Sequence, residues 1–371
     1  GLEKYPKLRF KGFSEPWKTV RIGDVYAERS ERGAEDMELL SVTMNDGVKM
    51  RSDIEGKDNS SEDKSNYKIV RAGDMVYNSM RMWQGANGIS PWDGIVSPAY
   101  TVLKPRMPIS NGFFAALFKT HRLINEFRKN SQGMTSDTWN LKYPQIETIK
   151  TCIPELAEQE KIADFLMALD QRIEKQRTLV ECLKKYKRGL LDAVFNQKIH
   201  VTNDDEEWQE CRIGDILKIL HGRDYKDYQA PDGEYPVLGT GGIIDHATKY
   251  LCDWACVLIG RKGTIDKPQY MDTPFWTVDT LFYSKPEAFH NPKFQYYLFQ
   301  TINWKKYNEA SGVPSQSSST IEGINVRVPN LHTQEIIANL FSQVDELIDY
   351  YAVMLARLQE CKKGLMQQLF I

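Results

Sequence analysis

The chain has 371 residues, two to three times the length of a typical domain, so we expect at least two packed units. Hydrophobic residues make up 41% and charged residues 26%, which excludes a collagen-like, a disordered or a disulfide-framework protein. The 48 Lys and Arg residues are balanced by 50 Asp and Glu residues, so the net charge of -2 is not that of a chain that binds polyanions by itself.

Neither a membrane span nor a secretion signal is recognisable. No stretch approaches the ~20 apolar residues that cross a bilayer, and Gly1 to Lys11 carries charges where a signal peptide has an apolar core. Of six scattered cysteines, only Cys252 and Cys256 lie close in sequence, and no second Cys or His pair stands at metal spacing. We therefore expect a cytoplasmic protein with reduced thiols, no metal site and no membrane contact.

The first recognisable element is a short motif that recurs later in the chain. Residues 15–25 match residues 206–216 at an offset of 191, with the shared pattern W-x3-R-I-G-D before a β-branched residue. Trp17 and Trp208 are the tryptophans of the two copies. This repeat predicts a chain built from two related halves.

The segment after the first copy is mixed and rich in strands. Short apolar runs next to Gly or Asp predict strands at Tyr67–Val70 and Met75–Tyr77, and we expect a helix at Gly112–Lys129. A basic and aromatic cluster at 81–84 follows the second strand, and a loop at 135–143 offers hydroxyls, an amide, a cation and aromatic rings. Both clusters suit contact with a nucleic acid, and an ordinary solvated loop is the alternative.

A long amphipathic helix follows this strand-rich segment, which we call the first head. Pro154 prevents a helix from continuing through from upstream, and the Gln-Glu pair at 159–160 places negative charge in the first turn. From Ile162 onward, apolar residues recur at alternating spacings of three and four over about five heptads, which is the pattern of a coiled-coil seam. From Glu158 to Phe195 such a helix would be about 57 Å long at ~1.5 Å per residue.

The second half repeats this organisation. We expect strands at Tyr235–Leu238 and Ala255–Ile259 and a helix at Pro292–Tyr307. The glycine-rich run 239–242 is compatible with a phosphate cradle, but a hairpin between two strands is the simpler interpretation. A basic loop at 261–264 follows a strand, and a polar run at 315–320 precedes the next helix. These two clusters occupy places that match those of the first half.

The second long helix is a copy of the first. Residues 154–195 and 329–370 are identical at 13 of 42 aligned positions, at an offset of 175. A helix of this length cannot bury its own stripe, so we expect the two helices to pair antiparallel; the alternative is that each stripe packs on its own head. The predicted seam comprises Ile162, Leu166, Leu169, Ile173, Leu183 and Leu190 with Ile337, Phe341, Val344, Ile348, Leu358 and Leu365.

Two residue types interrupt the apolar pattern at the same places in both helices. Lys187 and Lys362 occupy one seam position, where a lysine sets register or oligomeric state. Gly189 and Gly364 also correspond, and glycine inside a helix costs ~1 kcal/mol relative to alanine. A close approach of two backbones or a local kink would explain these glycines.

The N-terminal segment aligns with the residues that follow the first long helix. Residues 6–10 match residues 197–201 at the offset of 191, so the N-terminus corresponds to a continuation of the second helix beyond residue 370. We therefore expect the two chain ends to lie close together, in a circular pseudo-two-fold arrangement.

Motifs for catalysis are missing. The Asn/Asp-Pro-Pro-aromatic element of base methylation does not occur, and Gly260–Thr264 lacks the spacing of a phosphate-binding loop. None of the six histidines neighbours a Ser or Cys in a recognisable nucleophile setting. We expect a chain without catalytic residues.

The recurring clusters give a set of candidate DNA-binding residues. Arg, Lys, Gln and Asn match base edges, while Ser and Thr suit phosphates. The candidates are Arg81, Trp83, Gln84, Thr138, Trp139, Asn140 and Lys142 in the first half, and Arg261, Lys262, Thr264, Ser315, Gln316 and Ser317 in the second.

Taken together, the repeats and motifs resemble the specificity (S) subunit of type I restriction-modification systems, over nearly the whole chain. The segment before Trp17 is similar to the family's opening, and the Pro-x-Leu-x-x-Gln-Glu helix starts are similar to its conserved regions. Segments similar to target-recognition-domain motifs lie at 94–100, 133–141, 236–242, 257–264 and 275–280.

The resemblance implies an α+β fold. It comprises two pseudo-repeated, mixed α/β target-recognition domains joined by two long helices that form an antiparallel coiled coil. We expect the first target-recognition domain at residues 1–154 and its helix at 155–200, and the second domain at 201–329 with its helix at 330–371.

The resemblance also implies a non-catalytic subunit. Each head would read one half of a bipartite site in double-stranded DNA, while the coiled coil sets the gap and docks two modification (methyltransferase) subunits; restriction (translocase) subunits would join in the full complex. S-adenosylmethionine, ATP and Mg²⁺ would be bound by those partners, and the isolated chain would bind DNA weakly and salt-sensitively. The rival hypotheses are a coiled-coil scaffold that binds proteins and a nuclease that acts alone.

Overall fold

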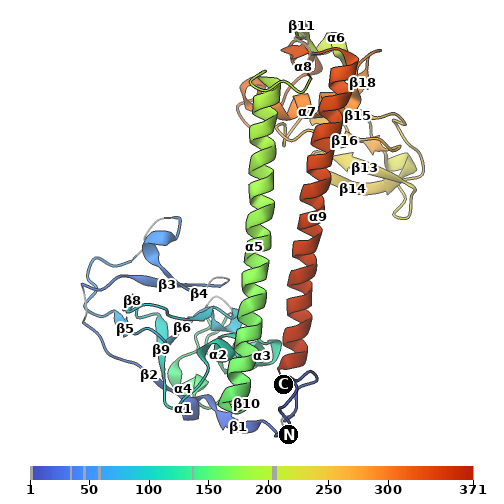
Figure 1. Cartoon of the computed structure of the whole chain (residues 1–371). Helices are drawn as coiled ribbons and strands as arrows, with labels where there is room; N and C mark the ends of the chain where they lie inside the picture. The colour runs from blue at the N-terminus through green and yellow to red at the C-terminus, as the bar shows by residue number, and fades with distance from the viewer. Residues whose placement is uncertain are drawn as a thin grey trace. The chain divides into compact units, whose positions relative to one another are not determined.

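Each long helix is divided between two structural units. The computed structural model describes residues 3–33, 36–44, 47–56, 60–135, 138–202 and 207–370 (Figure 1). Unit 1 comprises residues 1–177 and 354–371, and unit 2 comprises residues 178–353. Each unit therefore holds one head, the start of the helix that follows it and the end of the other helix. Glu206 of the repeated motif lies outside the described residues.

The head of unit 1 is built from short strands and helices that precede a long helix. Its elements are β1 (Lys18–Arg21), α1 (Ile22–Val25), β2 (Tyr26–Glu28), β3 (Leu40–Thr43), β4 (Gly47–Met50), η1 (Arg51–Asp53), β5 (Lys68–Val70), β6 (Met75–Asn78), η2 (Met82–Gln84), β7 (Asn87–Ile89), β8 (Gly94–Val96), β9 (Tyr100–Pro105), α2 (Asn111–Leu117), α3 (His121–Asn130), α4 (Tyr143–Ile146), β10 (Lys150–Ile153) and α5 (Leu156–Phe195). A four-stranded sheet has the order β2-β9-β6-β7, and β1-β10, β3-β4 and β5-β8 form antiparallel pairs.

The head of unit 2 shares its four-stranded sheet and its outer strand pair with the head of unit 1, and it adds a three-stranded sheet. Its elements are β11 (Gln209–Arg212), α6 (Ile213–Ile216), β12 (Leu217–His221), η3 (Lys226–Tyr228), β13 (Tyr235–Gly239), β14 (Gly242–Ala247), β15 (Cys256–Gly260), β16 (Gln269–Met271), β17 (Trp276–Thr277), β18 (Leu281–Pro286), α7 (Pro292–Thr301), η4 (Trp304–Tyr307), α8 (Ser318–Glu322), β19 (Asn325–Val328) and α9 (Leu331–Leu369). The sheet β12-β18-β15-β16 corresponds to that of unit 1, the pair β11-β19 corresponds to β1-β10, and the added sheet has the order β14-β13-β17. The predicted hairpin at 239–242 joins β13 to β14.

The two shorter helices expected from the sequence are each interrupted. Residues 112–129 form α2 and α3 with a break before Thr120, whose hydroxyl donates to the carbonyl of Leu117 (2.7 Å) and accepts from the N–H of Leu123. A threonine that bonds to the backbone in this way starts a new helix. Residues 292–307 likewise form α7 and the separate turn η4, where the buried indole of Trp304 donates to the carbonyl of Phe299 (2.8 Å).

A buried glutamine fastens the start of each long helix to its head. Gln159 accepts from the N–H of Ser110, the residue before α2, through Oε1 (3.1 Å) and donates to the carbonyl of Pro154 (2.9 Å). Gln334 makes the same two bonds, with the N–H of Asn291 (2.9 Å) and the carbonyl of Pro329 (2.9 Å). The repeated Gln of the helix-start motif thus satisfies backbone groups that burial would otherwise leave unpaired.

Within each unit the two helix segments run antiparallel and are joined by an ion pair. Lys362 on α9 pairs with Asp170 on α5 in unit 1, and Lys187 on α5 pairs with Asp345 on α9 in unit 2 (2.6 Å). One pair becomes the other when each residue is replaced by its equivalent at the offset of 175. The two seam lysines therefore hold the helices in one antiparallel register, as predicted.

The sequence raised two alternatives for the apolar stripe of each helix, packing on the other helix or packing on a head. The structure shows both. All of the predicted seam residues are buried or half-buried. At the ends, Ile162 and Leu166 join the head core of unit 1, and Ile337 and Phe341 join that of unit 2. The stripe thus packs on a head at its ends and toward the other helix between them. No helix of the described chain has a stretch long and apolar enough to cross a membrane.

The two ends of the chain meet in unit 1, as the offset of the N-terminal segment predicts (Figure 1). The N–H of Leu8 donates to the carbonyl of Gln368 (2.9 Å). In unit 2, the equivalent N–H of Ile199 donates to the carbonyl of Ala193 (3.2 Å). The same contact is therefore made once within a continuous chain and once between its two ends, which is the expected circular pseudo-symmetry.

Of the two explanations offered for Gly189 and Gly364, a close approach of two backbones is wrong. A Cβ atom added to either glycine meets no other atom within 4 Å, so neither packs against a neighbouring backbone. Both lie inside continuous α-helices. Nothing in the chain itself requires glycine at these two positions.

We predict that Gly189→Ala and Gly364→Ala each stabilise the isolated chain, because alanine fits the space and restricts the unfolded chain. A gain of up to about 1 kcal/mol corresponds to a rise in Tm on the order of 2 °C, measured by calorimetry. Gly260→Ala is the control and lowers Tm, since its Cβ would lie 2.1 Å from the carbonyl oxygen of Thr264. A fall in Tm for either helix variant would contradict the prediction.

Candidate nucleic-acid interface

In unit 1, the loop after strand β6 lies against the loop before helix α4. The N–H of Leu141 donates to the carbonyl of Ser79 (2.9 Å). The rings of Trp83 and Trp139 meet edge to face, with centroids 5.2 Å apart. The two clusters singled out in the first half of the sequence thus form one surface, which we call edge 1 (residues 79–84 and 138–142). Ser136 and Asp137 of this loop lie outside the described residues.

In unit 2, the corresponding loops meet in the same way. The N–H of Gln316 donates to the carbonyl of Arg261 (3.0 Å), and the N–H of Gly263 donates to the carbonyl of Pro314 (2.8 Å). Leu141 and Gln316 each stand two residues before the short helix α4 or α8, so the bonds are equivalent. We call this surface edge 2 (residues 261–264 and 313–317).

Edge 1 presents cations beside a tryptophan pair. Arg81 and Lys142 are exposed, while Trp83 and Gln84 are half-buried. The guanidinium of Arg128, on α3, lies 5.6 Å from the centroid of a Trp83 ring, where a cation is attracted by the ring face. The surface therefore offers hydrogen-bond donors around a fixed aromatic plate.

The other candidates of edge 1 shape its loop. The hydroxyl of Thr138 donates to the carbonyl of Thr135 (3.0 Å) and closes a turn. Asn140 pairs its backbone with Gln132, and its side-chain Oδ1 is buried without a hydrogen-bond partner among the described residues. These residues position Trp139 and Lys142.

The candidate residues of edge 2 differ in their exposure to solvent. Lys262 is exposed, whereas Arg261 is half-buried and its Nη1 donates to the carbonyl of Asp279 (3.4 Å). Gln316 is only 3% exposed, and its Nε2 donates to the carbonyl of Gly260 (2.8 Å). Gln316 therefore supports the loop from inside, and its amide does not face a ligand.

Glycine is required where edge 2 begins. The carbonyl oxygen of Thr264 lies 2.1 Å from the position that a Cβ on Gly260 would occupy. Thr264 and Ser315 are both half-buried. The tight return of the chain brings the exposed Lys262 to the end of strand β15.

A carboxylate at edge 2 was not singled out from the sequence. Ser317 caps α8, accepting from the N–H of Thr320 (3.2 Å), and its hydroxyl donates to Oε1 of Glu309 (2.9 Å). Hydrogen bonds from the hydroxyls of Thr320 and Ser317 lower the pKa of Glu309. An ionised carboxylate at such a surface accepts a hydrogen bond from a cytosine amino group and repels phosphates.

Two further residues, distant in sequence from the predicted clusters, also lie beside the edges. Arg128 lies on a helix whose periodicity indicates packing alone, and Thr240 belongs to the hairpin turn, 3.8 Å from where a Cβ of Gly263 would lie. Only the folded chain brings them to the edges. A basic residue in the last turn of α3 was the one available signal for Arg128.

No metal site accompanies these surfaces in the part of the chain that the structure describes, where three or more His, Cys, Asp or Glu side chains nowhere gather. The thiols of Cys252 and Cys256 are 4.0 Å apart and buried in the core of unit 2. A hydrogen bond from Cys256 lowers the pKa of Cys252, and the same contact together with burial raises the pKa of Cys256.

A family model decides what kind of protein carries these two edges. The model, described as the type I restriction modification DNA specificity domain, matches residues 14–181 and 205–359. The chain belongs to this family. Each matched segment of the specificity-family chain contains one of the two edges and most of the long helix that follows it.

Relatives of the chain are specificity subunits. It is 23% identical over 420 residues to the type I restriction enzyme MjaVIII specificity subunit of Methanocaldococcus jannaschii, with 99% of this chain and 95% of the relative covered. A shorter match is 30% identical over 151 residues to the MjaIX specificity subunit of the same organism and covers 38% of this chain and 31% of the relative.

Solved structures share the fold. The type-I restriction-modification S subunit from M. genitalium is similar over 99% of both chains, with a TM-score of 0.65 and 16% identity. The HsdS subunit from Thermoanaerobacter tengcongensis matches with a TM-score of 0.51 and 14% identity, covering 97% of this chain and 98% of that one.

We predict that Lys142→Ala and Lys262→Ala each weaken DNA binding by this specificity-family chain uniformly across sequences. Each exposed lysine neutralises one phosphate, so each variant lowers the slope of log K against log salt by about one. Fluorescence anisotropy over a salt series measures both the DNA affinity and this slope. Lys104→Ala, at an exposed lysine of β9 outside edge 1, is the matched control. Equal losses in all three variants would contradict a specific role for the edges.

Proposed function

We propose that this chain is the DNA-recognition subunit of a type I restriction-modification complex, in which each head recognises one half of a bipartite target. The observation that carries the proposal is the duplication of the edge. Both heads bring the same two loops together with the same backbone bond, from Leu141 to Ser79 and from Gln316 to Arg261. A shared backbone with different side chains suits two half-sites of different sequence.

The proposed target-recognition domains are residues 1–154 and 201–329, each followed by a helical segment, 155–200 or 330–371. The contribution of this chain is non-catalytic: it selects the site, and other subunits modify or cleave the DNA. The partners are double-stranded DNA, two modification subunits and, in the full complex, restriction subunits. In this proposal those subunits bind S-adenosylmethionine, ATP and Mg²⁺, and the complex acts in the cytoplasm.

The long helices are proposed to set the gap between the half-sites. Helix α5 is continuous for 40 residues, about 60 Å at ~1.5 Å per residue, which corresponds to one to two turns of duplex DNA. The ion pairs Lys187–Asp345 and Lys362–Asp170 fix the register of the two helices. A fixed register is what a ruler requires.

We predict that selection from a random duplex library, with the complex formed with the modification subunit, enriches a bipartite motif. Arg81→Ala, in edge 1, then relaxes the preference in one half only, and Arg261→Ala, in edge 2, acts only on the other half. A protein-binding scaffold would give no enrichment, and that result would overturn the proposed function.

A second prediction concerns the gap. Removing one heptad from each helix, residues 175–181 and 350–356, keeps both stripes in phase and both ion pairs in place. We expect the gap in the methylated motif to shorten by about three base pairs, since seven residues span about 10.5 Å and a base pair ~3.4 Å. Methylome sequencing measures the gap, and an unchanged gap would contradict the ruler.

A further inference from the structure

The turn that joins β13 to β14 in unit 2 lies beside edge 2. We call residues 239–242 the hairpin tip; they are the glycine-rich run whose sequence is compatible with a phosphate cradle. The hydroxyl oxygen of Thr240 is 3.8 Å from the position that a Cβ on Gly263 would occupy. The hairpin tip is therefore a neighbour of the basic loop 261–264, although it is distant from that loop in sequence.

Two neighbouring strands hold the hairpin tip in place. From β16, Nε2 of Gln269 donates to the carbonyl of Gly239 (3.0 Å). The N–H of Val278, which follows β17, donates to the carbonyl of Leu238 (3.2 Å). A site fixed in this way binds a ligand without first having to be ordered.

The polar groups of the hairpin tip have no partner within the described chain. The N–H groups of Thr240 and Gly241 donate to none of its carbonyls, and the hydroxyl of Thr240 makes no hydrogen bond with it. Lys262 is exposed and forms neither an ion pair nor a hydrogen bond with the residues that the structure describes. Backbone N–H groups, a hydroxyl and an ammonium are the donors with which proteins bind phosphates.

The hairpin itself does not require glycine at residue 241. The φ angle of Gly241 lies outside the left-handed region, which Gly242 occupies with a φ of 110°. Gly241 is exposed, and an added Cβ would meet no atom within 4 Å. Because glycine lets another molecule approach the backbone closely, a ligand at the tip accounts for this residue.

Two exposed isoleucines follow the hairpin tip on β14. Ile243 is 62% exposed and Ile244 is 54% exposed. An inorganic phosphate ion has no apolar part that would cover them, whereas each phosphate of DNA is flanked by deoxyribose rings. Donors beside apolar side chains therefore match a sugar–phosphate backbone better than a free anion.

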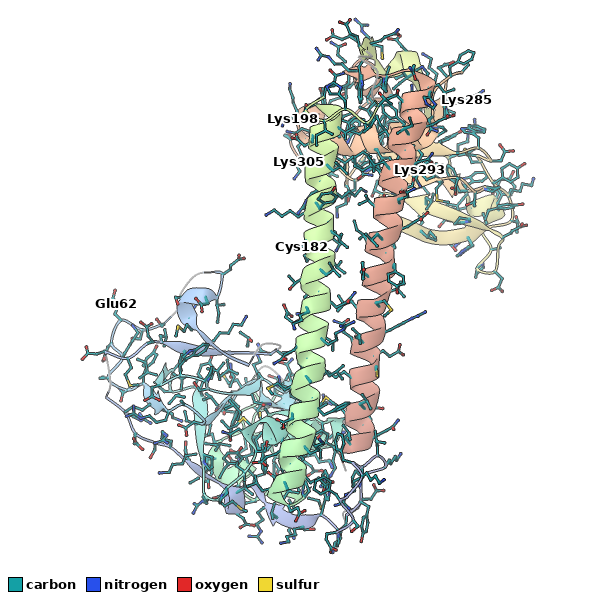
Figure 2. The ribbon with its side chains drawn as sticks, in the orientation of Figure 1. Glu62, Cys182, Lys198, Lys285, Lys293 and Lys305 are labelled. Carbon is teal, nitrogen blue, oxygen red and sulfur yellow. The ribbon has the colours of Figure 1, made fainter. Side chains whose placement is uncertain are left out.

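The carboxylates on neighbouring segments have other partners. Asp245 of β14 accepts a hydrogen bond from Nε2 of Gln229 (2.6 Å). Asp266 pairs with Lys305 of η4 (3.4 Å), which is labelled in Figure 2. Glu309 is held by hydroxyls at the start of α8, after the other loop of edge 2. The exposed ammonium of Lys262 is thus left to attract an anion to the hairpin tip.

We propose that the hairpin tip binds one phosphodiester of duplex DNA. The donors are the N–H groups of Thr240 and Gly241, the hydroxyl of Thr240 and the ammonium of Lys262, while Ile243 and Ile244 pack against the adjoining deoxyribose. The DNA backbone is thereby held at the loop 261–264, and the base edges face the loop 313–317. This inference rests on the proposed function and adds the place at which edge 2 holds the DNA backbone.

A double-mutant cycle between chain and DNA tests this contact. The probe is the duplex that selection with the modification-subunit complex enriches, prepared with one uncharged methylphosphonate linkage at each position in turn. We expect one linkage, in the half-site that Arg261→Ala relaxes, at which the lost charge weakens binding by the unaltered complex about tenfold. Fluorescence anisotropy at a fixed salt concentration measures the affinities.

Thr240→Glu places a carboxylate at the hairpin tip and is expected to weaken binding to the unmodified duplex about tenfold, through repulsion of the phosphate. At the same linkage, the uncharged methylphosphonate then causes no further loss, because the two changes remove one contact. Thr248→Glu, at an exposed threonine just beyond the other end of β14, is the matched control and keeps the affinity of the unaltered complex.

Three outcomes would overturn the phosphate site. In the first, the losses from Thr240→Glu and from the uncharged linkage add at every position. In the second, Thr248→Glu loses as much affinity as Thr240→Glu. In the third, Thr240→Glu keeps its affinity for DNA, including the case in which it loses a protein partner instead. If selection enriches no motif, the proposed function itself fails, whereas an enriched motif with additive losses removes only the phosphate site.

Bulk at Gly241 provides a second measurement. Gly241→Ala is expected to keep the Tm of the chain, because the space beside this glycine is open. It is expected to weaken binding to the unmodified duplex several-fold, because the added Cβ stands where the phosphate approaches the backbone. An affinity equal to that of the unaltered complex would overturn the role given to Gly241.

Discussion

A buried side-chain amide governs the direction in which each long helix leaves its head. Gln159 and Gln334 each bind the backbone at the start of a head helix and the carbonyl of the proline before the long helix. Removing such an amide would leave buried backbone groups unpaired, at about 1 to 3 kcal/mol each. Because two bonds to different elements constrain the amide, helix and head move together, and the positions of edge 1 and edge 2 follow the long helices.

The two units share one backbone scaffold, but the side chains around the shared features differ. Backbone bonds, helix starts and the reciprocal Lys–Asp pairs recur in both units, but their surroundings differ. The side chain of Lys187 is 12% exposed and lies 5.1 Å from the centroid of the Tyr297 ring, whereas that of Lys362 is 29% exposed. The Lys187–Asp345 pair is therefore less screened by solvent than the Lys362–Asp170 pair, and it holds the register of the two helices more strongly.

The sequence predicts the features that depend on periodicity and repetition. The seam of the long helices, the strands near residues 68–70 and 75–78, and the meeting of the chain ends all follow from spacings along the chain. It does not predict the break at Thr120, because a hydroxyl competing for the backbone leaves the apolar period intact. Nor does it show that Gln316 turns inward while Lys262 turns outward, since loop residues have no period. The pairing of Arg128 with Trp83 joins elements that only tertiary structure brings together.

The hydrogen bond from Leu8 to Gln368, which closes unit 1, costs more conformational entropy to form than its counterpart in unit 2, from Ile199 to Ala193. Ile199 and Ala193 are six residues apart, whereas Leu8 and Gln368 are 360 residues apart. Closing the longer loop in an unfolded chain costs about 3 to 4 kcal/mol more. Unit 2 is a continuous stretch of chain, but unit 1 needs residues from both ends. During synthesis, the first head therefore emerges long before the last turns of α9, and the core of unit 1 stays open until residues 365–370 leave the ribosome.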